Sequence, residues 1–137
     1  MNANYYSLIN YSPTWMPLTT ATTTTTNIQT RTISGAQYQV DWGDGSITTH
    51  NSHTVANKTY SSPYAGVIKV RALSGGLINI NKLHITAGNW NFDISVLKYY
   101  VPNLTYLYLN SNTSTWTGNL ANAPSGLKTL YLNSNLS

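Results

Sequence analysis

Carboxylates and histidines are the side chains of this chain that could carry chemistry, and both are few. The 137 residues include three acidic residues, Asp41, Asp44 and Asp93, and no glutamate. Asp41 and Asp44 are close enough in sequence to suit general acid and base catalysis or, with backbone carbonyls, a calcium ion. Two carboxylates rarely complete the six or more oxygen ligands of calcium, and Asp44 precedes Gly45 as in a turn. We therefore expect structural roles for both.

Histidine is the other candidate, as a zinc ligand. His50 and His53 lie close together in the sequence, and His84 is the third histidine. The pair has no third ligand in its loop, and the chain contains no cysteine. A nucleophile with a recognisable base, a glycine-rich phosphate loop and a cofactor motif are also absent from the sequence. The sequence thus predicts no catalytic residue, no metal and no cofactor, and indicates a protein that is not an enzyme.

The stretch from 38 to 46, YQVDWGDGS, contains Asp41 and Asp44 and predicts a β-hairpin. Apolar side chains at 38, 40 and 42 alternate with polar ones, which is the pattern of a half-buried strand. The Asp44-Gly45 dipeptide tolerates positive φ at both central positions of a tight turn. We therefore expect the chain to fold straight back into residues 46–49.

This hairpin stretch resembles the WGDG signature of PKD-type domains, which are immunoglobulin-like β-sandwiches found mostly in surface and extracellular proteins. Lys58-Thr-Tyr60 stands where such domains carry His-Thr-Tyr, and residues 66–72, GVIKVRA, are similar to their closing Gly-x-Tyr-x-Val strand. Lys58 and Val67 depart from that pattern. The resemblance implies an immunoglobulin-like β-sandwich over residues 1–75, including an N-terminal arm, and the Gly-rich residues 74–76 form the natural boundary.

Three other segments of the first 75 residues carry local signals. Residues 1–18 contain prolines and many apolar side chains, and we expect an irregular or edge segment there. The threonine-rich residues 19–26 predict a strand pair with a turn, because threonine is β-branched. Residues 61–63, Ser-Ser-Pro, predict a turn between a short strand at 55–60 and the strand at 66–72.

Beyond residue 76 the sequence repeats itself. Three copies of L-x-x-L-x-L-x-x-N, with a period of about 23 to 24 residues, begin at Ile80, Leu104 and Leu127, and Gly88 replaces the final Asn in the first copy. The pattern resembles leucine-rich repeats of bacterial surface proteins. It implies a short leucine-rich repeat solenoid of about three repeats over residues 76–137, with the Leu side chains inside the stack. Between the first two copies, residues 93–100 predict a short helix with Asp93 as its N-cap.

The residues between the inward Leu positions are expected on the exposed face of the repeat strands. Tyrosine offers apolar area with a hydrogen-bonding tip, which suits protein contacts or stacking on sugar rings. The same tyrosines could instead serve to stabilise neighbouring strands through cross-strand pairing. Three columns are expected: His84, Tyr108 and Tyr131; Lys82, Tyr106 and Thr129; and Thr86, Asn110 and Asn133. The candidate binding residues are Lys82, His84, Tyr106, Tyr108 and Tyr131.

Composition narrows the class of protein further. Only 7% of the residues are charged, and the net charge of +4 comes from basic residues that are scattered singly. A nucleic-acid interface would need clustered basic residues, so we expect no nucleic-acid partner. The chain has no apolar run of the length of a membrane-spanning helix, and its start lacks the features of a signal peptide. A neutral polar composition is typical of extracellular, cell-surface and virion-surface proteins.

Two functional hypotheses follow from these patterns. The first is a mainly β, non-enzymatic, surface-exposed binding or adhesion module that contacts protein or glycan through the repeat face. The alternative is a structural subunit of an ordered assembly, such as a phage virion decoration or fibre protein. It rests on the aromatic N-terminal arm and on the absence of a capping unit after the third repeat. These two segments are where we expect a homo-oligomer or assembly contact.

Overall fold

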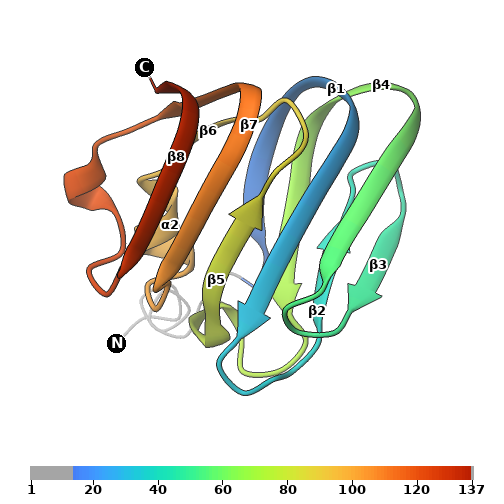
Figure 1. The fold of residues 1–137 in the computed structure, drawn as a ribbon. Helices are drawn as coiled ribbons and strands as arrows, with labels where there is room; N and C mark the ends of the chain where they lie inside the picture. The colour runs from blue at the N-terminus through green and yellow to red at the C-terminus, as the bar shows by residue number, and fades with distance from the viewer. Residues whose placement is uncertain (1–13, 137) are drawn as a thin grey trace, which may run out of the picture.

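The computed structural model describes residues 14–136, with the side chains at 112–113 and 134–136 excepted, and it confirms a mainly β fold (Figure 1). Three short helices accompany the strands: η1 (Leu77–Asn79), α2 (Val96–Tyr100) and η2 (Leu120–Asn122). The strands in chain order are β1 (Met16–Thr32), β2 (Tyr38–Asp41), β3 (Ile47–His50), β4 (Val55–Ala72), β5 (Ile80–Ile85), β6 (Asn91–Asp93), β7 (Tyr106–Thr117) and β8 (Thr129–Leu136).

The strands join in one mixed sheet with the order β3-β2-β4-β1-β5-β7-β6, and β8 pairs with β7. Antiparallel pairing connects the strands from β3 to β5, whereas β5, β6 and β8 are each parallel to β7. The sheet continues across the predicted boundary at residues 74–76, because β1 pairs with β5 and aligns Arg31 with Lys82. The two parts of the chain therefore share one sheet, and their division into domains stays a prediction.

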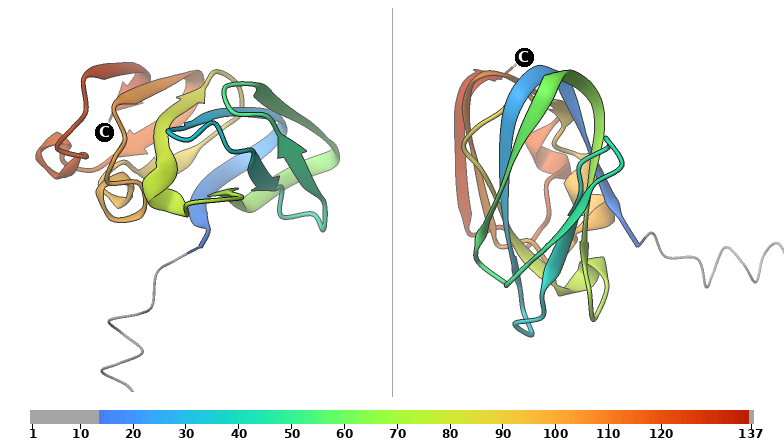
Figure 2. Two further views of the ribbon diagram at one scale, coloured as in Figure 1. Left: turned by 90° about the horizontal axis from the view of Figure 1, so that it is seen from below. Right: turned by 90° about the vertical axis from the view of Figure 1, so that its right-hand side faces the viewer.

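The longest strands bend over and contribute to two layers (Figure 2). The end of β1 pairs with the start of β4 and with β5, while the start of β1 pairs with the end of β4 and forms a bridge from Thr20 to Trp90. Strand β7 also contributes to both layers, because its start pairs with β5 and its end pairs with β6. The layer formed by β5, the starts of β4, β7 and β8 and the end of β1 faces the viewer in Figure 1, and we call it the front layer.

The bends correct two expectations about turns. The threonine-rich residues 19–26 and residues 61–63 lie inside the continuous strands β1 and β4, not in turns between separate strands. Register shifts between Thr20 and Thr25 let the two strands change direction together while their pairing continues, as β-bulges do. The predicted irregular segment also ends earlier than expected, because Met16 and Leu18 are buried residues of β1. Of the residues before this strand, 1–13 lie outside the described residues.

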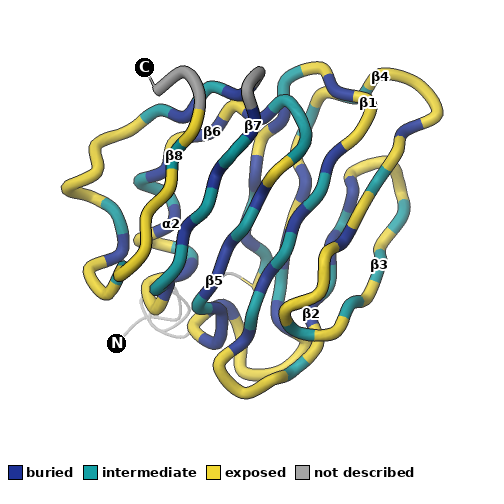
Figure 3. The backbone as a smooth tube through the Cα atoms, viewed as in Figure 1, coloured by how far each residue is buried: buried dark blue, intermediate teal, exposed yellow. Residues whose placement is uncertain are grey.

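The core lies between the two layers and is built from the inward side of each strand. Buried and more exposed residues alternate along both ends of β1 and the start of β7, whereas β5 departs from this alternation because Lys82 is also buried, at 8% exposed (Figure 3). The inward repeat positions of the first two copies are fully buried, as predicted: Leu83, Ile85, Leu107 and Leu109. Three tryptophans complete this core without exposed surface: Trp42, Trp90 and Trp116.

The predicted hairpin exists, but its turn differs from the expected one. Strands β2 and β3 pair from Tyr38 to Asp41, and the loop has positive φ at Gly43 (82°) and Gly45 (92°), not at Asp44. The Asp44 carboxylate accepts a hydrogen bond from the Ser46 N–H at 3.0 Å and pairs with the Lys58 ammonium at 2.6 Å. These contacts stabilise a wider loop than a two-residue turn allows, with a glycine at each of its left-handed positions.

The predicted helix before Pro102 is confirmed as α2, although Asp93 is not its cap. The helix begins at Val96, and Ser95 occupies the N-cap position. The Asp93 carboxylate accepts a hydrogen bond from the Ser95 N–H at 2.8 Å, in the turn that precedes the helix. None of the helices formed by residues 14–136 has the length and apolar character that a bilayer crossing requires.

Candidate binding face

The parallel strands bring the five predicted binding residues onto one outward surface of the front layer. Pairing aligns Lys82 with Tyr106, and it aligns His84 with Tyr108 and then with Tyr131. The expected columns of the repeats are therefore rows of neighbouring side chains in the structure. We call this surface, formed by Lys82, His84, Tyr106, Tyr108 and Tyr131, the aromatic face.

Stacking among the rings decides which parts of the aromatic face a partner can touch. The Tyr108 ring lies 4.3 Å from the His84 ring and 4.4 Å from the Tyr131 ring, centroid to centroid, and is nearly parallel to Tyr131 at 9°. Both faces of the Tyr108 ring are thus covered, so it presents an edge and its hydroxyl. Tyr131 stands at the end of the row and is 42% exposed. This geometry supports the expected cross-strand stabilisation and leaves the outer side of Tyr131 open.

Tyr106 lies outside the stacked row and has a different environment. Its ring centroid is 6.4 Å from that of Tyr108, and the Lys82 ammonium lies over it at 4.9 Å. Its pairing partner on β8 is Thr129, which is too small to cover an aromatic ring. Tyr106 therefore combines a cation–π contact on the β5 side with a small neighbour on the β8 side, and it is partly exposed.

The third predicted column forms a polar row beside the rings. The Asn133 side-chain amide donates to the Asn110 side-chain oxygen at 2.7 Å, and the Asn110 side-chain amide donates to the Tyr108 hydroxyl at 3.4 Å. On the β1 side the Asn27 amide donates to the Thr86 hydroxyl at 2.7 Å. The aromatic face is thus bordered by neutral donors and acceptors.

Arg31 and His53 lie beside the face, next to Lys82, and sequence reasoning did not assign either to it. The Lys82 ammonium donates to His53 Nε2 at 2.8 Å, and the Arg31 Nε–H donates to the Asn81 side-chain oxygen at 2.8 Å. We call Arg31, His53 and Lys82 the basic cluster. The proximity of Arg31 to Lys82 depends on the pairing of β1 with β5, which no motif in either segment indicates.

Burial and like charges lower the pKa values of His53, Lys82 and His84. The charge of Lys82, followed by burial and the charge of Arg31, holds the pKa of His53 below its usual range. Burial, followed by the charge of Arg31, lowers the pKa of Lys82. Burial and the charges of Lys82 and His53 likewise lower the pKa of His84, whose Nδ1 is buried without a hydrogen-bond partner among the described residues. At neutral pH His53 is therefore neutral and accepts from Lys82.

The carboxylates lie away from the aromatic face and are engaged in local contacts. Asp41 accepts from the Gly43 N–H at 2.9 Å, and hydrogen bonds from Lys58 and Ser46 lower the pKa of Asp44 to about 2. The hydrogen bonds of Ser95 hold the pKa of Asp93 below its usual range. No group of three or more histidine or acidic side chains within the described residues is arranged to hold a metal ion.

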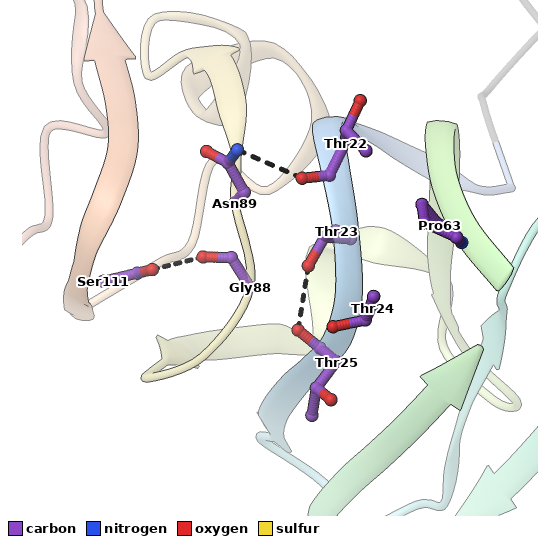
Figure 4. Close-up of a pocket in the computed structure, with 8 residues that line it drawn as sticks. All are labelled: Thr22, Thr23, Thr24, Thr25, Pro63, Gly88, Asn89 and Ser111. Carbon is purple, nitrogen blue, oxygen red and sulfur yellow. Dashed lines mark hydrogen bonds between the residues drawn. The ribbon is translucent and has the colours of Figure 1, made fainter. Parts of the chain in front are cut away.

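A shallow pocket at the bends of β1 and β4 is lined by uncharged residues (Figure 4). The Asn89 amide donates to the Thr22 carbonyl oxygen at 3.1 Å, and the Ser111 hydroxyl donates to the Gly88 carbonyl. The pocket contains no titratable side chain, so it supplies no acid, base or nucleophile with an activating partner. Its lining is Thr22, Thr23, Thr24, Thr25, Pro63, Gly88, Asn89 and Ser111.

Comparisons of the chain with protein-family models, with curated proteins and with solved structures find no match.

Proposed function

We propose that this chain is a non-enzymatic, surface-exposed binding or adhesion module that contacts protein or glycan through the aromatic face. The observation that carries the proposal is the parallel register of β5, β7 and β8, which gathers aromatic and polar side chains on one outward surface. Tyr131 and Tyr106 supply ring surface, and the Tyr108 hydroxyl and the neighbouring amides supply hydrogen bonds. Aromatic side chains with a polar tip are typical of such contact surfaces.

The finer fold assignment is part of the same proposal. We propose a PKD-like, immunoglobulin-like β-sandwich over residues 1–75 and a leucine-rich repeat segment over residues 76–137. The second assignment is supported by the alignment of the three sequence copies, because Leu83, Leu107 and Leu130 occupy equivalent positions on adjacent parallel strands. Both resemblances favour an extracellular, cell-surface or virion-surface location.

The aromatic face is tested by screening the purified chain on glycan and protein arrays together with a variant in which Tyr106, Tyr108 and Tyr131 are all serine. We expect the variant to bind the strongest array partner at least about tenfold more weakly, because each substitution removes ring area and a hydroxyl. A matched pair of single variants separates position from residue type. Tyr131→Ser should weaken binding, whereas Tyr99→Ser, on α2 and 66% exposed, should not.

Unchanged binding by the triple variant would contradict the site. Absence of any partner on both arrays would contradict the proposed function. Circular dichroism of each variant checks that the fold is kept.

The alternative function, a structural subunit of an ordered assembly such as a phage virion decoration or fibre protein, is favoured by one observation at β8. Leu130 is 42% exposed, whereas Leu83 and Leu107 at the equivalent repeat positions are fully buried. Strand β8 pairs with β7 alone among the described strands. A strand from another subunit would cover Leu130 as β7 covers Leu83. The N-terminal arm, the other expected assembly contact, lies outside the described residues.

Light scattering over a concentration series distinguishes the alternative. Assembly predicts a molar mass that rises above 15.1 kDa with concentration and returns to that of the monomer in Leu130→Asp. Leu120→Asp is the matched control, since Leu120 is 43% exposed but lies in η2. A wild-type mass of 15.1 kDa at every concentration would count against assembly.

A further inference from the structure

The basic cluster of Arg31, His53 and Lys82 lacks a counter-charge. Its interactions with its neighbours involve like charges, and no carboxylate of the described residues contacts it. Two of the three aspartates are in the β2–β3 hairpin region, where Asp44 pairs with Lys58, and the third ends β6. With His53 neutral, Arg31 and Lys82 are two like charges on paired positions of β1 and β5, which is electrostatically unfavourable until an anion arrives.

Neutral contacts hold the cluster in place and leave the terminal amino groups of Arg31 available, whereas Lys82 is buried, at 8% exposed, beneath its contact with His53. Asn81 accepts from Arg31 Nε, so the two terminal amino groups of the guanidinium have no acceptor among the described residues. The Gln29 amide donates to the His53 carbonyl at 2.8 Å, and the His53 N–H donates to the Thr30 carbonyl at 2.8 Å. These two bonds fix the loop of His53 against β1. A fixed guanidinium with free amino groups is suited to a bidentate contact with a carboxylate.

The cluster is continuous with the aromatic face through Lys82, whose ammonium lies over the Tyr106 ring. We propose that the aromatic face binds an acidic glycan, with the carboxylate of one sugar at Arg31, His53 and Lys82 and the neighbouring sugar rings over Tyr106 and towards Tyr131. This inference rests on the proposed function and names its ligand class. A carboxylate placed on a sugar ring supplies both the charge that the cluster lacks and the flat surface that the tyrosines accommodate.

Protonation of His53 is coupled to this binding. The charged or titratable groups that face His53 are Lys82 and His84 on β5 and Arg31 on β1. A bound carboxylate favours the charged form of His53, so binding takes up a proton and strengthens as the pH falls from 8 to 5.5. His53 has a φ of 70°, and asparagine tolerates this conformation, which makes His53→Asn a suitable variant.

The experiment measures binding of the full chain to hyaluronan, polygalacturonate, alginate and polysialic acid, each beside its carboxyl-reduced form. We expect the acidic form of at least one glycan to bind at least about tenfold more tightly than its reduced form. Arg31→Gln should lose most of that difference, and Arg31→Lys should recover part of it. Lys69→Gln removes the same charge from an exposed position on β4 and should change nothing. His53→Asn should remove the strengthening at low pH.

The outcomes separate this inference from the proposed function. Equal binding of acidic and reduced glycans, or no binding to any of them, overturns the acidic-glycan inference. The proposed function is then still tested by the array screen with the triple tyrosine variant. Tighter binding of a sulfated glycan such as dextran sulfate, with the same loss in Arg31→Gln, overturns the carboxylate as the anion. If single-stranded DNA binds more tightly than every acidic glycan, and Arg31→Gln weakens that binding, the proposal that the ligand is a glycan is overturned.

Discussion

Replacing Trp42 by alanine should lower the free energy of unfolding by about 3–5 kcal/mol, the usual range for removing a buried aromatic side chain. Trp42 is fully buried, and its indole N–H donates to the Thr48 hydroxyl at 2.8 Å. The Tyr60 hydroxyl donates to the Trp42 carbonyl at 2.8 Å. Truncation to alanine leaves a cavity and removes the hydrogen bond to Thr48, whose hydroxyl keeps its contact with His50 Nε2 at 2.7 Å, while the Tyr60 bond to the backbone carbonyl remains. Urea denaturation monitored by circular dichroism measures the change.

Trp15→Ala is the matched control for this substitution. Trp15 is partly exposed and stacks with the Arg71 guanidinium at 4.3 Å, so we expect a loss of about 1 kcal/mol. If Trp42→Ala does not fold, Trp42→Phe keeps most of the ring and should cost less. Equal losses for Trp42→Ala and Trp15→Ala would show that Trp42 is not part of the core.

Gly43→Ala has the second large expected effect, about 2–5 kcal/mol of unfolding free energy. The left-handed φ of 82° costs a side chain about 1–2 kcal/mol. An added Cβ would also lie 2.7 Å from the Val67 carbonyl oxygen and in contact with the Tyr64 hydroxyl, and forcing such neighbours apart costs a further 1–3 kcal/mol or so.

Gly45→Ala separates these two contributions in the same loop. Gly45 has a φ of 92°, but a Cβ there would meet no atom within 4 Å, so only the conformational cost of about 1–2 kcal/mol remains. Both losses are measured by urea denaturation. A larger loss for Gly45→Ala than for Gly43→Ala would contradict the described packing of Tyr64 and Val67 against the loop.

The repeat register could be predicted because it depends on a local period. Leu83 and Leu107 occupy the same position of successive copies, and the structure pairs them on adjacent parallel strands. The structure also explains why the first copy departs from the pattern at Gly88. Its φ is 111°, and a Cβ would lie 2.7 Å from the Trp90 indole nitrogen, so no asparagine fits there.

The bends of β1 and β4 could not be predicted from the residues that form them. Threonine and Ser-Ser-Pro sequences are compatible with strands and with turns. Each bend continues as strand because the partner strand bends beside it, with register shifts that accommodate both. Such a feature belongs to the pair of strands and leaves no signal in either one alone.

Only the part of the candidate site that lies in the repeat strands could be predicted from the sequence. Lys82, His84 and the three tyrosines follow from the outward positions of the repeat. Arg31 comes from β1, and His53 comes from the loop before β4. They lie beside Lys82 because β1 pairs with β5 as well as with β4. This pairing joins segments about fifty residues apart, and neither the hairpin motif nor the repeat pattern predicts it.

The central claim is that the outward surface of β5, β7 and β8 is the binding surface, and an NMR footprint tests it most directly. The strongest array partner is titrated into the isotope-labelled chain, and the shifts of backbone amides are recorded. We predict the largest shifts at residues 82–86, 106–110 and 129–133, with Arg31 and His53 responding to an acidic glycan. Shifts confined to the β2–β3 hairpin or to α2 and β6, with the aromatic face unchanged, would contradict the account.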